Sequence, residues 1–289
     1  MTETGFHLKR HLTSFQIMIL GFAGVILLGA LVLMLPIATA SHTWTPFHEA
    51  LFTSTSAVCV TGLVVQDTGS YWSGFGQTVI LLLIQIGGLG VITAAVTFLM
   101  LSGKNISLKE RSAMQDAISA PVVGGIVRLT RFILKGTFFV ELVGALALLP
   151  AFCRDYGLRG VWMAIFHSVS AFCNAGFDVL ADTDAGGSLC RYATDPVVNF
   201  TIMALIIIGG LGFAVWGDIR HNRRFSRMSV YTRLVILITT VLIFGGAGIF
   251  AALEWNNPGT LGGLTPSQKL MAALFQSVTL RTAGFATFD

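Results

Sequence analysis

Charged residues are scarce in this sequence. Only 11% of its 289 residues are Asp, Glu, Lys or Arg, whereas 54% are hydrophobic. Soluble domains carry about 25% charged residues, and a soluble fold of this composition would expose a large apolar surface to water. The composition therefore excludes an ordinary soluble domain and predicts a polytopic membrane protein.

Cysteines are also few, and sequence patterns for metal binding or catalysis are missing. The four cysteines form no C-x-x-C pair and no Cys/His cluster. No nucleophile–base pair, phosphate-binding motif or carboxylate pair stands in a recognisable context. We therefore expect neither an enzyme nor a covalently bound cofactor. Cys153 and Cys190 lie in one predicted outer loop, where a disulfide is chemically possible.

The positive charges gather in alternate polar segments. The net charge of +4 could indicate nucleic-acid binding, but most of the basic residues precede the first apolar run or fill two later segments, 104–135 and 220–233. The remaining loops are mainly acidic, with residues such as Asp67, Asp178 and Glu254. Lys/Arg-rich loops stay cytoplasmic, so the pattern predicts a multi-pass protein in a lipid bilayer with a cytoplasmic N-terminus and no nucleic-acid partner. The segments 104–131 and 220–233 are equally candidates for docking a regulatory partner and for attracting anionic lipid.

Apolar segments recur in the order span, half-span, loop, return span. The first run, 15–35, is longer than a signal-peptide core and fits a retained transmembrane helix. The predicted segments are 15–35, 45–57 and 77–101 in the first unit, 132–150, 160–171 and 197–216 in the second, and 234–253 and 265–279 in the third. The predicted division of the chain is 1–103 for the N-terminal segment and first repeat, 104–131 for a cytoplasmic connection, 132–217 for the second repeat, 218–233 for another cytoplasmic connection, and 234–289 for a third repeat that stops after its loop.

The half-spans are too short to cross a bilayer core of about 30 Å, and two of them carry helix-start signals. Thr45-Pro46 and Thr265-Pro266 each predict a capping hydroxyl before a proline at the first helical position. Gln268 adds a predicted capping box with Thr265. Half-spans of this kind are tolerated at membrane depth when protein or a wet cavity surrounds them.

Each half-span is followed by a short loop centred on a glycine: Gly62, Gly176 or Gly284. A cation that loses its water needs a ring of oxygens, which backbone carbonyls supply without placing a fixed charge in the membrane. Glycine allows the backbone angles that turn successive carbonyls inward. The repetition therefore predicts an ion filter, with re-entrant packing loops of a secondary carrier as the alternative.

Several further residues attract attention. The return spans share an Ile-Gly-Gly-Leu-Gly motif at 86–90 and 208–212, which predicts a packing face or, alternatively, room for ions below the filter. Arg281 is expected to point away from the pore and to pair with a carboxylate. Glu141, inside a span, is either functional or hydrogen-bonded to a neighbouring helix. His48 and His167 are expected to cap or pack.

The loops and motifs resemble the Trk/Ktr/HKT superfamily of potassium transporters, and most closely its Ktr-type potassium uptake membrane proteins. The resemblance rests on the stretches 47–52, 56–63, 85–90 and 275–285 and covers essentially the whole chain. It implies four units around a pseudo-fourfold potassium pore, a bacterial plasma (inner) membrane location, a homodimer, a cytosolic nucleotide-binding regulatory ring, and sodium as a candidate coupling ion. By resemblance, the filter carbonyls belong to Val60, Thr61, Gly62, Asn174, Ala175, Gly176, Thr282, Ala283 and Gly284.

Glycine rather than serine at Gly62, Gly176 and Gly284 goes with potassium selectivity in that superfamily. The third return span and the fourth unit have no counterpart in this chain, so we expect a fragment that does not conduct alone. Two alternatives to potassium uptake remain open. One is a secondary carrier that uses the loops as a midplane site, and the other is a non-conducting membrane scaffold.

Overall fold

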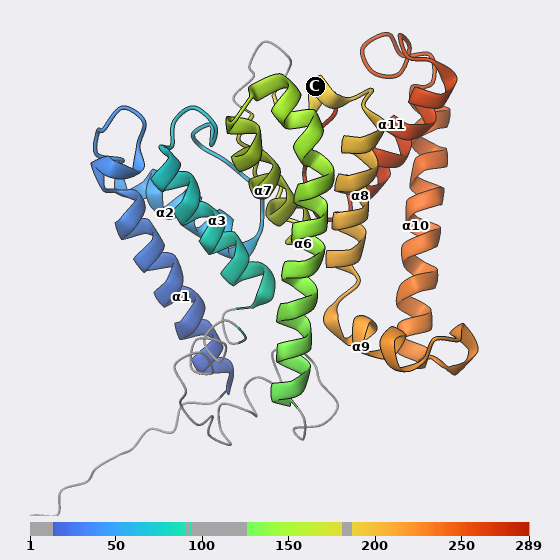
Figure 1. The fold of residues 1–289 in the computed structure, drawn as a ribbon, viewed down its shortest axis with the longest axis horizontal. Helices are drawn as coiled ribbons and strands as arrows, with labels where there is room; N and C mark the ends of the chain where they lie inside the picture. Colours follow the sequence, from blue (N-terminus) through green and yellow to red (C-terminus); the bar gives the residue numbers. More distant parts are fainter. Residues whose placement is uncertain (1–13, 91–92, 94–125, 181–186, 289) are drawn as a thin grey trace, which may run out of the picture.

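The computed structural model describes residues 14–90, 93, 126–180 and 187–288 (Figure 1). These residues form helices joined by turns, and their one isolated β-bridge joins Thr39 to Trp72. The helices are α1 (Ser14–Leu33), α2 (Phe47–Cys59), α3 (Gly74–Leu89), α6 (Ile126–Tyr156), α7 (Arg159–Phe172), α8 (Pro196–Gly210), α9 (Phe213–His221), α10 (Val230–Glu254) and α11 (Pro266–Thr279), with 3-10 turns η1 (Pro36–Ala38), η3 (Cys190–Tyr192) and η4 (Phe225–Arg227). Lys9, Arg10 and residues 104–125 of the connection predicted over 104–131 lie outside the described residues.

The helices repeat one arrangement along the chain. Each long helix, α1, α6 or α10, contacts the short helix that follows it, α2, α7 or α11. The first two short helices also contact their return helices, α3 and α8. Between units, α3 contacts α7 and α8 contacts α11. The short helices therefore follow one another across the molecule in chain order, with α3 between α2 and α7 and α8 between α7 and α11 (Figure 1).

The long helices have the length and composition of membrane spans. Among the described residues, the segments 128–156 of α6 and 230–254 of α10 are long and apolar enough to cross a bilayer. The shorter helices α1 and α3 are also apolar. On α10, Leu237, Val241 and Phe244 are more than half exposed, and such side chains suit a lipid-facing surface. The fold is that of a polytopic all-α membrane protein.

The second return span is broken, contrary to the prediction of one helix over 197–216. Helix α8 ends at Gly210, and α9 leaves it at 90°. Gly212 between them has φ = +86°, which glycine adopts without strain. The indole N–H of Trp216 donates to the carbonyl of Ile208 at 3.0 Å and fastens the bend. In Figure 1, α9 lies across the lower ends of α8 and α10.

The helix-start predictions have mixed outcomes. The capping box of Thr265 and Gln268 is present, and the backbone N–H of Thr265 donates to Oε1 of Gln268 at 3.0 Å. Thr45 does not cap α2, because the N-cap is Pro46 and the Thr45 hydroxyl instead lies 3.2 Å from the Tyr71 hydroxyl. Helix α6 runs past the predicted end at Pro150 by six residues, to Tyr156.

Candidate ion-selectivity filter

The three glycine loops leave the C-terminal ends of α2, α7 and α11 with their amide groups turned back to the helix. In each loop the residue before the glycine donates its N–H to a carbonyl of the last helical turn. The three bonds are Thr61 N to Ser56 O (3.0 Å), Ala175 N to Ser170 O (2.7 Å) and Ala283 N to Thr279 O (3.0 Å). This pairing leaves the carbonyl sides of the loops available to a ligand.

The carbonyl oxygens predicted to form the filter have no protein partner in the described part of the chain. None of them accepts a hydrogen bond from a described backbone or side-chain donor; they belong to residues 60–62, 174–176 and 282–284. Unpaired carbonyls at membrane depth cost free energy unless water or an ion satisfies them. The C-terminal ends of the three helices add partial negative charge. The arrangement suits a partly dehydrated cation.

Successive loops also contact one another. A Cβ added at Gly62 would lie 2.6 Å from the carbonyl oxygen of Ala175, and one added at Gly176 would overlap the carbonyl oxygen of Ala283. Gly62, Gly176 and Gly284 all have positive φ (+74°, +69° and +78°). Gly62 and Gly176 therefore have two separate reasons to be glycine: a positive φ, and a neighbouring loop that leaves no space for a Cβ.

In the second and third loops, a hydroxyl group near the end of the short helix donates a hydrogen bond to the carbonyl of the residue that follows the loop glycine. Ser170 Oγ donates to the carbonyl of Phe177 at 2.7 Å, and Thr279 Oγ1 donates to that of Phe285 at 2.8 Å. The third loop makes this bond with one residue fewer between the hydroxyl and the acceptor. The first loop differs, since Ser56 Oγ lies 2.8 Å from Thr61 Oγ1.

Each short helix is anchored to its long helix by one serine, a feature that the sequence analysis did not predict. The hydroxyls of Ser54, Ser168 and Ser277 donate to the carbonyls of Ile26 (2.7 Å), Glu141 (2.6 Å) and Ile243 (2.7 Å). Three residues after each acceptor stands a glycine: Gly29, Gly144 or Gly246. A Cβ at Gly144 or Gly246 would lie 2.6 or 2.5 Å from the serine hydroxyl, and one at Gly29 would clash with it. Aligning the three repeats would have revealed this serine–glycine pair.

The glycine pairs of the return helices are packing faces, as predicted. A Cβ at Gly87 would clash with the carbonyl of Val58, and one at Gly209 with that of Phe172. Both carbonyls belong to the last turn of the unit's own short helix. The next glycine, Gly88, faces the following unit, where an added Cβ would lie 2.5 Å from Cys173 Sγ.

Arg281 departs from its prediction. Ion pairs among the described residues do not include it, and its Nη1 has no hydrogen-bond partner there. Its guanidinium instead approaches α8, with Nη2 3.6 Å from the Cβ position of Gly210. The predicted pairing with a carboxylate is therefore wrong for this part of the chain.

The histidines and cysteines have structural environments. His167 is fully buried, its Nδ1 lies 2.8 Å from the Met163 carbonyl, and its ring packs against those of Phe152 and Phe285. His48 departs from its prediction, because its side chain is 82% exposed with Nε2 3.9 Å from the Glu49 carboxylate, and it does not cap α2. No disulfide joins Cys153 to Cys190.

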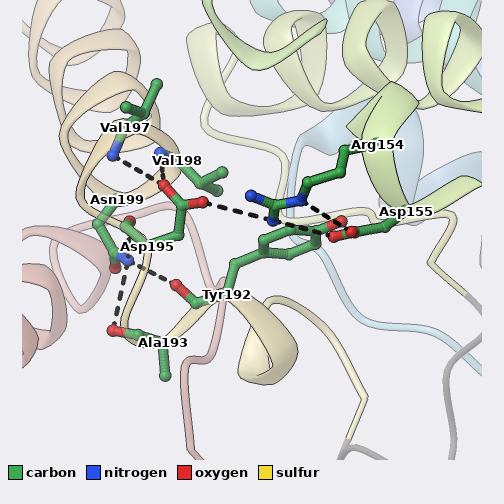
Figure 2. A network of polar contacts seen from close by, with 8 residues as sticks. All are labelled: Arg154, Asp155, Tyr192, Ala193, Asp195, Val197, Val198 and Asn199. Carbon is green, nitrogen blue, oxygen red and sulfur yellow. Dashed lines mark hydrogen bonds and ion pairs between the residues drawn. The ribbon is translucent and has the colours of Figure 1, made fainter. Parts of the chain in front are cut away.

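Polar contacts join the C-terminal end of α6 to the N-terminal end of α8 (Figure 2). Asp195 caps α8 by accepting from the N–H groups of Val197 (2.9 Å) and Val198 (3.3 Å). Arg154 donates to Asp155 at 3.0 Å and lies 3.8 Å from Asp195. These contacts hold the start of α8 against the end of α6.

Residues shortly before α8 also contact the third unit. The N–H of Leu189 donates to the Ala286 carbonyl at 2.9 Å, and the N–H of Ala286 donates to Ser188 Oγ at 3.1 Å. Asp178, just after the second glycine loop, is half-buried, and its burial raises its pKa to about 6. A half-buried acidic side chain therefore directly follows the second glycine loop.

Comparison with known proteins identifies the family. The family model described as TrkH, cation transport protein, matches residues 9–289. The chain belongs to the TrkH cation transport family. Within this family, it is 44% identical over 276 residues to the Ktr system potassium uptake protein B of Bacillus subtilis (strain 168), covering 95% of this chain and 60% of the relative. It is 38% identical over 290 residues to the potassium/sodium uptake protein NtpJ of Enterococcus hirae, covering 100% of this chain and 63% of that relative.

A solved structure agrees with the TrkH fold. The potassium transporter TrkH from Vibrio parahaemolyticus matches with a TM-score of 0.67 and 20% identity, covering 99% of this chain and 54% of that one. The likeness concerns the fold alone. The chain spans about three fifths of the length of the two curated relatives.

Proposed function

We propose that this chain forms part of the pore of a potassium uptake protein and that its three glycine loops select the ion with backbone carbonyls. One observation carries the proposal: the second loop's Ala175 carbonyl lies against Gly62, and the third loop's Ala283 carbonyl lies against Gly176. Three loops in sequence around one space are what a carbonyl filter needs.

The proposed ligands are the carbonyl oxygens of Val60, Thr61 and Gly62, of Asn174, Ala175 and Gly176, and of Thr282, Ala283 and Gly284. Their lack of protein donors in the described part of the chain supports the assignment. Potassium is the proposed cargo because glycine stands at all three loop centres and because relatives are named for potassium uptake. Sodium is a candidate second ion, since one relative is named for both.

The proposed setting follows from charge and from the relatives. We place the protein in the bacterial plasma membrane with its N-terminus in the cytoplasm, because the basic segment 220–233 joins spans whose opposite ends carry acidic loops. A homodimer on a cytosolic nucleotide-binding ring is the proposed assembly. Arg223, Arg224 and Arg227 are available for that contact, since each keeps part of its surface open to solvent.

Uptake by the natural full-length protein tests the proposal. Reconstituted in liposomes, it should take up potassium in preference to sodium, and it should restore growth of uptake-deficient cells at low potassium. Transport of an organic solute with no potassium flux would favour a secondary carrier. Absence of any flux from correctly inserted protein would favour a scaffold.

A further inference from the structure

A buried carboxyl group lies between the first and second units. Glu141 on α6 is only 6% exposed, and its side chain reaches that of Gln85 on α3. Cys173 in the second glycine loop lies within electrostatic reach of the same carboxyl group. Three elements, α3, α6 and the second loop, thus bring these side chains together.

Of the three units, only the second has a carboxyl group at the position of Glu141. The backbone carbonyl of Glu141 accepts from Ser168, just as those of Ile26 and Ile243 accept from their own serines. The three residues therefore occupy one register of the repeat. Isoleucine serves that register in units one and three, so anchoring a short helix does not require a carboxyl group.

The polar atoms at this position are costly. Oε1 of Glu141 and Nε2 of Gln85 make no hydrogen bond to any residue that the structure describes. A buried polar atom without a partner costs about 1–3 kcal/mol, and ionisable residues inside the membrane are functional candidates. Gln85 also lacks a polar counterpart, since the equivalent residue of α8 is Ile207.

The position of the pair connects it to the filter. Gly87, two residues after Gln85, packs on the last turn of α2, and Gly88 packs on Cys173. Cys173 directly precedes residues 174–176, whose carbonyls are proposed ligands. A substitution at Gln85 or Glu141 should therefore change the positions of the first and second glycine loops, which contact each other at Gly62.

We propose that Glu141 and Gln85 form a positioning pair that fixes the second filter loop against the first, and that Glu141 thereby determines cation selectivity. The inference rests on the proposed function of the loops as a filter. The pair acts through the placement of Cys173 and not by touching the ion.

The test compares potassium and sodium uptake by the natural full-length protein in liposomes. Glu141→Gln keeps the size and hydrogen-bonding capacity, and the exchange Gln85→Glu with Glu141→Gln keeps both groups in reversed positions. Glu141→Leu and Gln85→Leu each remove one partner. Ile243→Leu, at the same register in unit three, is the matched control. Gly176→Ser reports separately on the filter itself.

The pair predicts that Glu141→Leu and Gln85→Leu each lower the potassium-over-sodium ratio about tenfold, within the range of couplings between packed residues. Glu141→Gln, the exchange and Ile243→Leu should stay within about twofold of the natural protein. If both leucine variants keep the natural potassium-over-sodium ratio, the proposed role of Glu141 and Gln85 is overturned. It is also overturned if Ile243→Leu lowers the ratio as much as the two leucine variants do. If Glu141→Leu fails to insert, Gln85→Leu alone decides. Suppose that both leucine variants keep the natural ratio. If Gly176→Ser also leaves the ratio unchanged, the filter assignment fails as well. If Gly176→Ser lowers the ratio, the filter assignment stands and only the proposed role of Glu141 and Gln85 is overturned.

Discussion

The side-chain amide of Asn174 in the second loop is hydrogen-bonded to the hydroxyl of Thr282 in the third. Asn174 and Thr282 lie 3.0 Å apart in either orientation of the amide. In the orientation that pairs both amide atoms, the nitrogen donates to Thr282 Oγ1 at 3.0 Å and to the Ile206 carbonyl at 3.2 Å, and the oxygen accepts from the N–H of Gly210 at 3.3 Å. One side chain thereby joins two filter loops and a return helix. The equivalent residue of the first loop is Val60, which cannot form such a bridge.

Asn174→Gly should therefore lower stability. Asn174 has φ = +58°, so glycine preserves the backbone angle and removes only the hydrogen bonds. We expect a loss of about 1–3 kcal/mol, visible as a lower melting temperature in detergent. Val60→Gly is the control, because Val60 also has φ = +58°, which strains a β-branched residue. Val60→Gly should keep or raise the melting temperature, and an equal loss in both variants would contradict the bridge.

The serine–glycine anchors predict a contrast between two adjacent glycines of α10. Gly246→Val should overlap Ser277 of α11 and cost about 1–3 kcal/mol through overpacking. Gly245→Val has open space around its Cβ and should change stability by about 0.5 kcal/mol or less. Thermal unfolding of the two variants side by side measures this. Equal stabilities would mean that the anchor does not depend on close approach.

At the outer end of α8, Asp195→Ala should remove a helix cap. The loss of two accepted hydrogen bonds should cost about 1 kcal/mol. Arg154→Ala removes only exposed ion pairs (Figure 2) and should cost well under that amount. Chemical denaturation distinguishes the cap from the ion pair, and a larger loss in Arg154→Ala would reverse the assignment.

Asp178 gives the stability a pH dependence. Its pKa of about 6 in the folded protein exceeds the value of about 3.9 in an unfolded chain. The folded state therefore binds this proton more tightly, and the resulting stability is present below about pH 4 and lost as the pH rises through 6. Asp178→Asn should raise the melting temperature at pH 7.5, and the gain should vanish near pH 4. A gain that is the same at both pH values would exclude this origin.

Much of the fold could be predicted because apolar length and helix-start chemistry are local signals. The half-spans, the glycine loops and the capping box at Thr265 follow from the sequence in this way. The bend after Gly210 could not be predicted from hydrophobicity, since the apolar run continues through Phe213 and Trp216. The hydrogen bond from the Trp216 indole N–H to the Ile208 carbonyl, which joins α9 to α8, stabilises this bend.

The candidate site divides in the same way. The nine proposed carbonyl ligands come from a repeated motif, whereas the groups that hold them depend on contacts distant in sequence. Thr282 meets Asn174 across 108 positions, and Ser168 meets Glu141 across 27. Arg281 was expected to follow the rule that buried charges have partners, and its surroundings on α8 supply no carboxylate among the described residues.

The central claim is that the glycine loops select potassium, and Gly176→Ser in the natural full-length protein tests it most directly. Gly157→Ser is the control, because Gly157 has φ = +58° but open space around its Cβ position in the outer turn between α6 and α7. The measurement is the ratio of potassium to sodium uptake into liposomes. The account predicts a ratio reduced about tenfold or more in Gly176→Ser, equivalent to about 1.4 kcal/mol, and a natural ratio in Gly157→Ser. A natural ratio in Gly176→Ser, with flux intact, would contradict it.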